Sequence, residues 1–361
     1  MSGRPVLVTG GAGFIGSNIA DALASQGRSV LIYDSLARPG VERNLAWLTQ
    51  RHGSLIEPIR ADVRDAGELG RAAREAAAVF HMAAQVAVTT SLDDPREDFE
   101  INLGGTFNLL EALRRKCRPT PVVFASTNKV YGDLAALDFE LGRDGYAPTD
   151  AGIRAHGIGE AWPLDFHTPY GCSKGAADQY VLDSARSFGV PAAVLRMSCI
   201  YGQRQMGTED QGWVAHFLIR ALKGEPITLY GDGHQVRDIL DVSNAVEAYL
   251  AAWARIDRAA GRAFNLGGGP ANAVSLRTLI AEIGALTGRP VDVEFADWRA
   301  GDQRYFIADT RAAGAVLGLG PKLPWRTGVA RLAEWLAGEI GQQVQPAPAF
   351  DQPAARQAAA L

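Results

Sequence analysis

The 361-residue chain contains little cysteine, carries little net charge and has no long apolar run. Its three cysteines, Cys117, Cys172 and Cys199, are odd in number and lack the spacing of metal ligands, so we expect reduced thiols and no metal site. A formal net charge of −4 favours neither nucleic acid nor a membrane surface as a partner. No apolar run could span a bilayer, and Met1 to Pro5 leave no room for a signal peptide before the first apolar segment. These absences predict a cytoplasmic protein.

Short apolar runs alternate with segments of helical pattern through the first half of the chain. With 47% hydrophobic residues, a chain of this length can bury a large core. The expected strands are 5–8, 29–33, 55–59, 78–82, 122–126 and 192–196. The expected helices are 14–26, 66–76, 95–116 and 170–188. The alternation predicts an α/β fold with a Rossmann-type doubly wound parallel sheet, and the less regular second half predicts a smaller mixed α/β lobe.

A glycine-rich turn follows the first expected strand. Gly10 would make the tight turn, Gly13 would let the backbone approach a pyrophosphate, and Gly16 would let the next helix pack against the sheet. The helix N-terminus then offers free N–H groups to phosphate. The spacing is one residue off the commoner dinucleotide fingerprint, so by itself the turn could be an ordinary connection between a strand and a helix.

A carboxylate ends the second expected strand. Asp34 can accept hydrogen bonds from both ribose hydroxyls of a dinucleotide and would repel a 2′-phosphate. NAD is therefore favoured over NADP, although Arg38 lies close enough to complicate that preference.

A tyrosine and a lysine lie four residues apart, on one face of an expected helix. Lys174 can lower the pKa of the Tyr170 phenol and hold a nicotinamide ribose, so that Tyr170 acts as a base toward a substrate hydroxyl. Thr127, at the end of the fifth expected strand, would hydrogen-bond the same oxygen. Such a pair alone is more often a solvated helix pair. In a chain that also carries the glycine turn, it indicates a nicotinamide-dependent enzyme.

Two regions and a tail follow from this arrangement. We expect an NAD-binding Rossmann domain over 1–198, with a return segment near 236–266. Residues 199–235 and 267–340 would form a substrate-binding lobe. The Gln-, Pro- and Ala-rich residues 341–361 predict a mobile tail.

The stretch 133–167 is long and rich in Gly and Asp. It lies between the fifth expected strand and the helix that carries the tyrosine and the lysine. A loop of this length in a compact domain is typically functional, so we expect it to overhang the substrate cleft.

At this point the chain resembles the extended short-chain dehydrogenase/reductase family, in its sugar-nucleotide epimerase branch. Strings that match the branch occupy 9–16, 81–84, 102–106, 170–174, 231–238 and 299–302. Longer and more specific strings occupy 126–133, 164–180 and 210–214. The resemblance covers residues 6 to 340.

The resemblance implies a role for each matching position. Catalysis would rest on Thr127, Tyr170 and Lys174. NAD would be bound by Gly10, Gly13, Phe14, Ile15, Gly16, Asp34, Asp62, Val63, Ala83, Ala84, Gln85, Tyr170 and Lys174. The substrate would be bound by Thr127, Asn128, Lys129, His167, Cys199, Arg237 and Arg299, the two arginines gripping its diphosphate. The alternative for either arginine is a surface ion pair with Asp238 or Asp302, and for His167 it is a structural hydrogen bond.

Two positions depart from the pattern of the branch. Cys199 stands where many relatives have an asparagine that meets the substrate phosphate, so nucleotide or sugar placement should differ. Asn128 and Lys129 stand where dehydratases of the branch carry an Asp–Glu pair. A lysine does not replace a glutamate base there, so elimination of water is disfavoured.

The implied activity is NAD-dependent epimerisation of a nucleotide-diphosphate sugar by transient oxidation to a ketosugar. The more specific strings imply C2 of a CDP-sugar, which spacing alone does not show. A 4-epimerase on a UDP- or GDP-sugar and a non-catalytic dinucleotide-binding protein remain as alternatives. By analogy with the branch, the chain would form a homodimer or a higher homo-oligomer.

Overall fold

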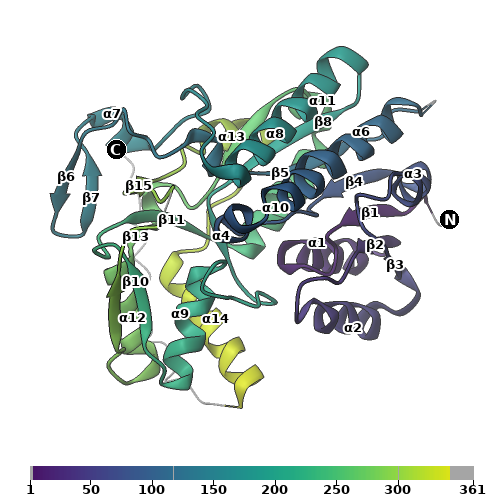
Figure 1. Ribbon diagram of the computed structural model, residues 1–361. Coiled ribbons are helices and arrows are strands. Elements are labelled where there is room, and N and C mark those ends of the chain that lie inside the picture. Colours follow the sequence, from purple (N-terminus) through teal and green to yellow (C-terminus); the bar gives the residue numbers. More distant parts are fainter. Residues whose placement is uncertain (1–2, 117, 300, 342–361) are drawn as a thin grey trace, which may run out of the picture.

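A seven-stranded parallel sheet forms the centre of the computed structural model, which describes residues 3–116, 118–299 and 301–341 (Figure 1). Its spatial order is β12-β8-β5-β4-β1-β2-β3. The strands are β1 (Val6–Thr9), β2 (Val30–Asp34), β3 (Ile56–Arg60), β4 (Ala78–His81), β5 (Val122–Thr127), β8 (Ala192–Met197) and β12 (Ala263–Leu266). The strand order reverses between β1 and β4. In such a sheet, a ligand is expected at the carboxyl ends of the strands at this point. The predicted fold class is confirmed.

Helices cover both faces of the sheet, because successive strand residues point to opposite sides. Val6 and Val8 belong to one apolar core, whereas Leu7 belongs to the other. The first face packs against α1 (Phe14–Ser25), α2 (Val41–His52), α10 (Val242–Ala254), α11 (Ile256–Ala259) and α13 (Arg311–Leu317). The second packs against α3 (Ala66–Glu75), α6 (Gly105–Arg114) and α8 (Thr168–Phe188), with α4 (Val88–Asp93) and α5 (Pro95–Phe99) beside them.

The helix predicted over 95–116 is interrupted. Between α5 and α6 the chain takes one π-helical turn, Glu100–Gly104. Asn102 in this turn donates hydrogen bonds to the Gln85 carbonyl and to Asp98 Oδ1, both at 3.0 Å. Such π-helical turns are frequent at functional sites and where a side chain interrupts the regular hydrogen bonding of a helix. Cys117 lies outside the described residues.

A second lobe sits below the carboxyl ends of the strands (Figure 1). One small sheet pairs β11 (Val236–Asp241) with β9 (Cys199–Tyr201), β13 (Ala273–Ser275) and β15 (Tyr305–Phe306). Another pairs β10 (Ile227–Tyr230) with β14 (Val293–Ala296). The helices α9 (Trp213–Lys223), α12 (Leu276–Thr287) and α14 (Trp325–Ile340) share an apolar core with them.

The expected return segment 236–266 divides between the two lobes. Within it, α10 and β12 pack on the central sheet, but β11 pairs only with strands of the second lobe among the described residues. The helix α13, which falls in the range assigned to the substrate lobe, packs against α10 and β12. Apart from Gly341, the predicted mobile tail lies outside the described residues. None of the described helices combines the length and the apolar character needed to cross a membrane.

The stretch 133–167, which we expect to overhang the substrate cleft, is ordered. It forms a hairpin, β6 (Phe139–Gly142) and β7 (Gly145–Pro148), followed by α7 (Ala151–His156). The Ile158 amide donates to the Ile307 carbonyl at 2.7 Å, and Tyr146 donates to Asp232 of the second lobe. These contacts hold the stretch at the side of the molecule away from α1 and α2, and no residue in it lines the cavity described below (Figure 1).

A buried ion pair fixes α8 on the sheet. Asp178 of α8 is fully buried and accepts two hydrogen bonds from Arg196 of β8, both at 2.9 Å. Ser126 of β5 donates to Asp178 Oδ2 at 2.7 Å. Arg196 also donates to the Tyr131 hydroxyl at 3.0 Å, which in turn donates to Asn265 of β12 at 2.7 Å. One polar network therefore joins three neighbouring strands to this helix.

Removal of one partner leaves the other charge buried and unpaired. We expect Asp178→Ala to lower the free energy of unfolding by about 3–5 kcal/mol. Asp183→Ala on the same helix is the matched control, because Asp183 is 54% exposed and pairs with Arg186 at 3.9 Å. An exposed pair of that kind contributes at most about 1 kcal/mol. Urea denaturation of both variants measures the difference, and equal losses would show that the buried pair does not anchor α8.

Candidate active site

A cavity of about 690 Å³ runs along the carboxyl ends of the central strands. Its wall on the sheet side contains Gly10 after β1, Asp34 on β2, Asp62 after β3, Ala83 after β4, Thr127 on β5 and Met197 on β8. The opposite wall belongs to the segment 204–214, which connects β9 to α9. The cavity therefore lies between the two lobes, at the point where the strand order reverses.

The glycines of the turn allow close contacts between backbone segments at the cavity wall. Gly10 has φ +64°, and a Cβ there would lie 2.7 Å from the Ala83 amide nitrogen. A Cβ on Gly16 would collide with the Gly10 carbonyl. Gly13, Phe14 and Ile15 line the cavity where α1 begins. The predicted phosphate-binding residues thus come together, and their backbone fits a pyrophosphate at a helix N-terminus.

Asp34 faces the cavity from the end of β2. Its Oδ2 accepts a hydrogen bond from the Ala12 amide at 3.0 Å, and Oδ1 accepts one from the Leu36 amide at 2.9 Å. Burial raises the pKa of Asp34, whereas these backbone bonds oppose that rise. Arg38 also lines the cavity and donates to the Met206 carbonyl at 3.5 Å. Its side chain is thereby directed toward the opposite wall.

The next two strands supply the remaining predicted NAD residues. The Asp62 carboxylate pairs with Arg64 at 2.7 Å, which lowers the pKa of Asp62. Val63, Ala83 and Ala84 line the cavity with it. The side chain of Gln85 lies on the cavity wall and donates to Asp98 at 3.1 Å.

Thr127, Tyr170 and Lys174 meet in the cavity, as the sequence predicts. Thr127 ends β5, while Tyr170 and Lys174 lie in the first turns of α8. All three are nearly buried, with exposed fractions of 8%, 8% and 2%. The Tyr170 amide donates to Ser91 Oγ at 3.2 Å, and Lys174 Nζ lies 4.2 Å from the centroid of the Phe124 ring.

Burial opposes charge on both titratable groups of this set. It raises the pKa of Tyr170 to about 12, against a hydrogen bond with Thr127 that lowers it. It also lowers the pKa of Lys174 to about 7, against the charges of Asp178 and Asp98, which raise it. The net shift of the Tyr170 pKa is upward, because desolvation outweighs the hydrogen bond with Thr127.

Comparisons with known proteins agree with this geometry. A model of the "NAD dependent epimerase/dehydratase family" matches residues 6–267. The chain belongs to this family. CDP-paratose 2-epimerase of Salmonella typhi is 40% identical over 339 residues, which cover 91% of this chain and 98% of that one. UDP-glucose 4-epimerase of Mycolicibacterium smegmatis is 32% identical, covering 91% of this chain and 97% of that one.

Solved structures of relatives share the whole architecture. The Thermus thermophilus UDP-glucose 4-epimerase, in complex with NAD, has a TM-score of 0.78 and 32% identity, covering 92% of this chain and 99% of that one. The Thermotoga maritima UDP-glucose 4-epimerase, with UDP-glucose, has a TM-score of 0.80 and 29% identity, covering 93% and 99%. This member of the family is an NAD-dependent sugar-nucleotide epimerase.

Several predicted substrate residues lie outside the cavity lining of this epimerase. Lys129 Nζ donates to the Gly301 carbonyl at 2.9 Å, and Asn128 donates to Gln303 at 3.2 Å. Arg237 is 7% exposed and pairs with Asp302 at 2.7 Å. The alternative for Arg237 is a surface ion pair with Asp238 or Asp302. The structure contains the pair with Asp302, and this pair is buried.

Arg299 and Cys199 lie closer to the cavity. The Arg299 guanidinium lies 3.4 Å from Asp210, which lines the cavity, and 3.7 Å from the centroid of the Tyr230 ring. Cys199 lines the cavity and accepts a hydrogen bond from Trp213 Nε1 at 3.3 Å. Burial raises the pKa of the Cys199 thiol, so the thiol stays protonated.

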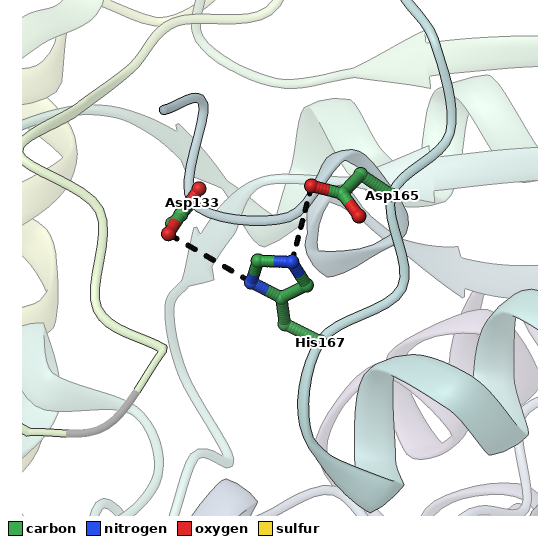
Figure 2. Close-up of side chains that lie close together, drawn as sticks. All are labelled: Asp133, Asp165 and His167. Carbon is green, nitrogen blue, oxygen red and sulfur yellow. Dashed lines mark ion pairs between the residues drawn. The ribbon is translucent and has the colours of Figure 1, made fainter. Parts of the chain in front are cut away.

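His167 lies outside the cavity lining, although it directly precedes α8. Figure 2 shows its ring between two carboxylates. Nε2 lies 3.1 Å from Asp165, and Nδ1 lies 3.8 Å from Asp133. His167 is 42% exposed and is not part of the cavity lining, and its contacts with the two carboxylates fit the structural alternative. An exposed group of two acids and a histidine is common without a metal.

Sequence reasoning missed two parts of the site. Asp98 is fully buried and accepts hydrogen bonds from Ser173, Asn102 and Gln85, and its charge raises the pKa values of both Tyr170 and Lys174. No motif singles it out. The wall 204–214 was also missed, although the specific string at 210–214 marks half of it.

The pKa of Lys174 makes the stability of NAD-free protein depend on pH. Between pH 7 and its ordinary value of 10.5, the unfolded chain keeps a proton on Lys174 that the folded chain has released. The free energy of unfolding should therefore rise with pH in this window, by about 1.4 kcal/mol per unit at most, and stay flat below it. Lys174→Met should lack this rise. Urea unfolding at pH 7, 8 and 9 measures both proteins, and parallel curves would contradict the assignment.

Proposed function

We propose that this enzyme epimerises C2 of a CDP-linked sugar, as in the conversion of CDP-paratose to CDP-tyvelose. The observation that carries this proposal is the 40% identity with CDP-paratose 2-epimerase over nearly the full length of both chains. The specific strings at 126–133, 164–180 and 210–214 support it, since they surround Thr127, Tyr170 and the wall opposite the sheet.

Three side chains carry the proposed chemistry. Tyr170 takes the proton of the C2 hydroxyl, and Thr127 donates a hydrogen bond to the same oxygen while the carbonyl forms. Lys174 holds the nicotinamide ribose and stabilises the phenolate. NAD, held by the glycine turn, Asp34 and Lys174, would supply the hydride acceptor at C2 and, once reduced, the hydride donor to the other face of the sugar. The ketosugar turns between these two steps, so the cofactor is regenerated in each turnover.

The residues of the glycine turn and Asp34 hold the cofactor in this proposal. Gly10, Gly13 and Gly16 line the cavity where α1 begins and would face the pyrophosphate, and Asp34 lies where the adenosine ribose would follow. For the substrate, Arg299 is the nearer of the two arginines to the cavity and would exchange its acidic partners for the diphosphate. Cys199, which lines the cavity, and Arg237, which pairs with Asp302, would also contribute to binding of the diphosphate.

Two other activities have a specific observation in their favour. Epimerisation at C4 of a UDP-sugar is the second candidate, because relatives with that name are 31–32% identical to this chain. Dehydratases are also related, at 28–31% identity. Dehydration is disfavoured here because Lys129 points its amine at Gly301 and supplies no second carboxylate base. A non-catalytic dinucleotide-binding protein would not need the buried set of Thr127, Tyr170 and Lys174.

The proposed assembly is a homodimer or a higher homo-oligomer. Phe99, Phe107 and Tyr180 are 54%, 46% and 50% exposed. The rings of Phe107 on α6 and Tyr180 on α8 meet edge to face, with centroids 5.9 Å apart. Exposed aromatic side chains on neighbouring helices favour a protein interface. The proposed location is the cytoplasm, which the low cysteine content supports.

The catalytic assignment predicts an order among three variants. Tyr170→Phe keeps the ring and its packing but removes the proton acceptor, so turnover should fall about 10²- to 10⁴-fold with NAD still bound. Thr127→Val should lose less, and Lys174→Met should lose both rate and NAD. Epimerisation rates and the nucleotide released on denaturation measure these effects. Near-normal turnover of Tyr170→Phe would show that the phenol is not the base.

A panel of CDP-, UDP-, GDP- and ADP-sugars tests the activity itself. Product formation is followed by NMR in heavy water. We expect a C2 epimer of a CDP-sugar without deuterium at C2, because the hydrogen travels as hydride and never becomes a proton. A C4 epimer of a UDP-sugar would replace the first candidate with the second. Deuterium at the epimerised carbon would indicate deprotonation or elimination instead of hydride transfer.

A further inference from the structure

We propose that Gln303 is a positioning residue, which sets the distance between the diphosphate end and the reacting end of the site. It forms the centre of an interlobe bridge, which we define as Asn128, Lys129 and Gly132 on one side and Gly301, Asp302 and Gln303 on the other. The proposal rests on the proposed function, because it assumes a substrate that reaches from the diphosphate arginines to Thr127.

Gln303 uses its whole side-chain amide to join the two lobes. Its Nε2 donates to the Gly132 carbonyl, and its Oε1 accepts from Asn128 Nδ2 at 3.2 Å. Gln303 is fully buried but does not line the cavity. A buried amide is unfavourable unless both of its ends are hydrogen-bonded, so this arrangement holds the two backbones at one separation.

The bridge begins one residue after the catalytic threonine. Asn128–Tyr131 form a short 3-10 turn that continues directly from Thr127 at the end of β5. Thr127 Oγ1 accepts a hydrogen bond from the Lys129 amide at 3.2 Å, which ties the hydroxyl to this turn. A displacement of the turn therefore displaces the hydroxyl that would meet the reacting oxygen.

The other side of the bridge leads to the diphosphate end. Gln303 lies four residues after Arg299, and its backbone carbonyl accepts from Arg237 Nη2. Asp302 between them pairs with Arg237 and accepts from the Gln303 amide at 3.0 Å. Arg237 therefore contacts the backbone of the residue whose side chain binds the turn after Thr127, and the Asp302 amide next to it donates to the Arg299 carbonyl at 3.2 Å.

Lys129 adds a second, parallel connection. Its Nζ donates to the Gly301 carbonyl at 2.9 Å, and burial lowers its pKa while Asp302 raises it. This contact gives Lys129 a role in the bridge, in addition to the substrate contact expected from the sequence.

The test compares Gln303→Leu with Asn272→Leu. Asn272 is a matched control, because it is a buried amide that joins Leu323 and Trp325 within the second lobe, at 3.0 Å each, without contact to the bridge. Both variants should lower the melting temperature. Only Gln303→Leu should lower kcat, by about 10- to 100-fold from misplacement of the sugar, with NAD content and CDP affinity unchanged. Lys129→Met should also lower kcat, by a smaller factor, and leave NAD content and CDP affinity unchanged.

Hydrogen exchange separates failure of this proposal from failure of the proposed function. In Gln303→Leu, amides of 128–132 and 299–303 should exchange faster together, whereas Asn272→Leu should change neither segment. The exchange rates of these amides test the bridge whether or not the wild-type enzyme turns over a CDP-sugar. Unchanged exchange in both segments, or equal kcat values in the two Leu variants of an active enzyme, would overturn the positioning role. If Gln303→Leu does not fold, Lys129→Met decides by the same two measurements.

Discussion

The site depends first on the buried pair of Asp178 and Arg196. Asp178 lies on α8, one turn after Lys174 and two turns after Tyr170, so all three share a helix face. Arg196 and Ser126 grip its carboxylate from β8 and β5. The pair therefore fixes the rotation and the height of α8 over the strand that ends in Thr127. A purely apolar contact would permit small rotations, whereas a bidentate ion pair in a dry environment has one favourable geometry.

Desolvation decides the protonation of the site. The same burial that makes the geometry rigid raises the pKa of Tyr170 and lowers that of Lys174, so neither charged form is favoured by the protein alone. His81 below them stays neutral, since burial and the charge of Lys174 lower its pKa to about 3. Asp178 and Asp98 both favour the Lys174 ammonium, but Asp98 also disfavours the Tyr170 phenolate. The pKa of Tyr170 must therefore be lowered further, by the charge of the bound cofactor and by a hydrogen bond with the substrate hydroxyl, before Tyr170 acts as a base.

Local patterns predict the part of the molecule that local chemistry determines. The apolar strands, the glycine turn and the spacing of Tyr170 and Lys174 are each set by neighbours along the chain, and the fold class follows from them. The placement of the stretch 133–167 and the interlobe bridge depend on contacts between segments far apart in sequence, such as Tyr146 with Asp232. Gln303, for example, meets Asn128 across 175 residues. Arg237 illustrates the same limit: its motif predicts a phosphate ligand, and only the fold shows its buried pair with Asp302.

The two lobes are tied together at both ends of the cavity, and this explains how separate binding regions can serve one reaction. At the Asp34 end, the Arg204 guanidinium lies 4.0 Å from the ring centroid of Trp47 on α2 and 5.5 Å from that of Trp335 on α14. At the Thr127 end, the amide of Gln303 joins the lobes by hydrogen bonds. Hydrogen bonds also join the two walls at the Asp34 end, from Asn44 to the Arg204 carbonyl at 3.2 Å and from Arg38 to the Met206 carbonyl at 3.5 Å. Directional bonds therefore hold the lobes at both ends of the cavity, so the adenosine site and the reacting groups keep a fixed separation.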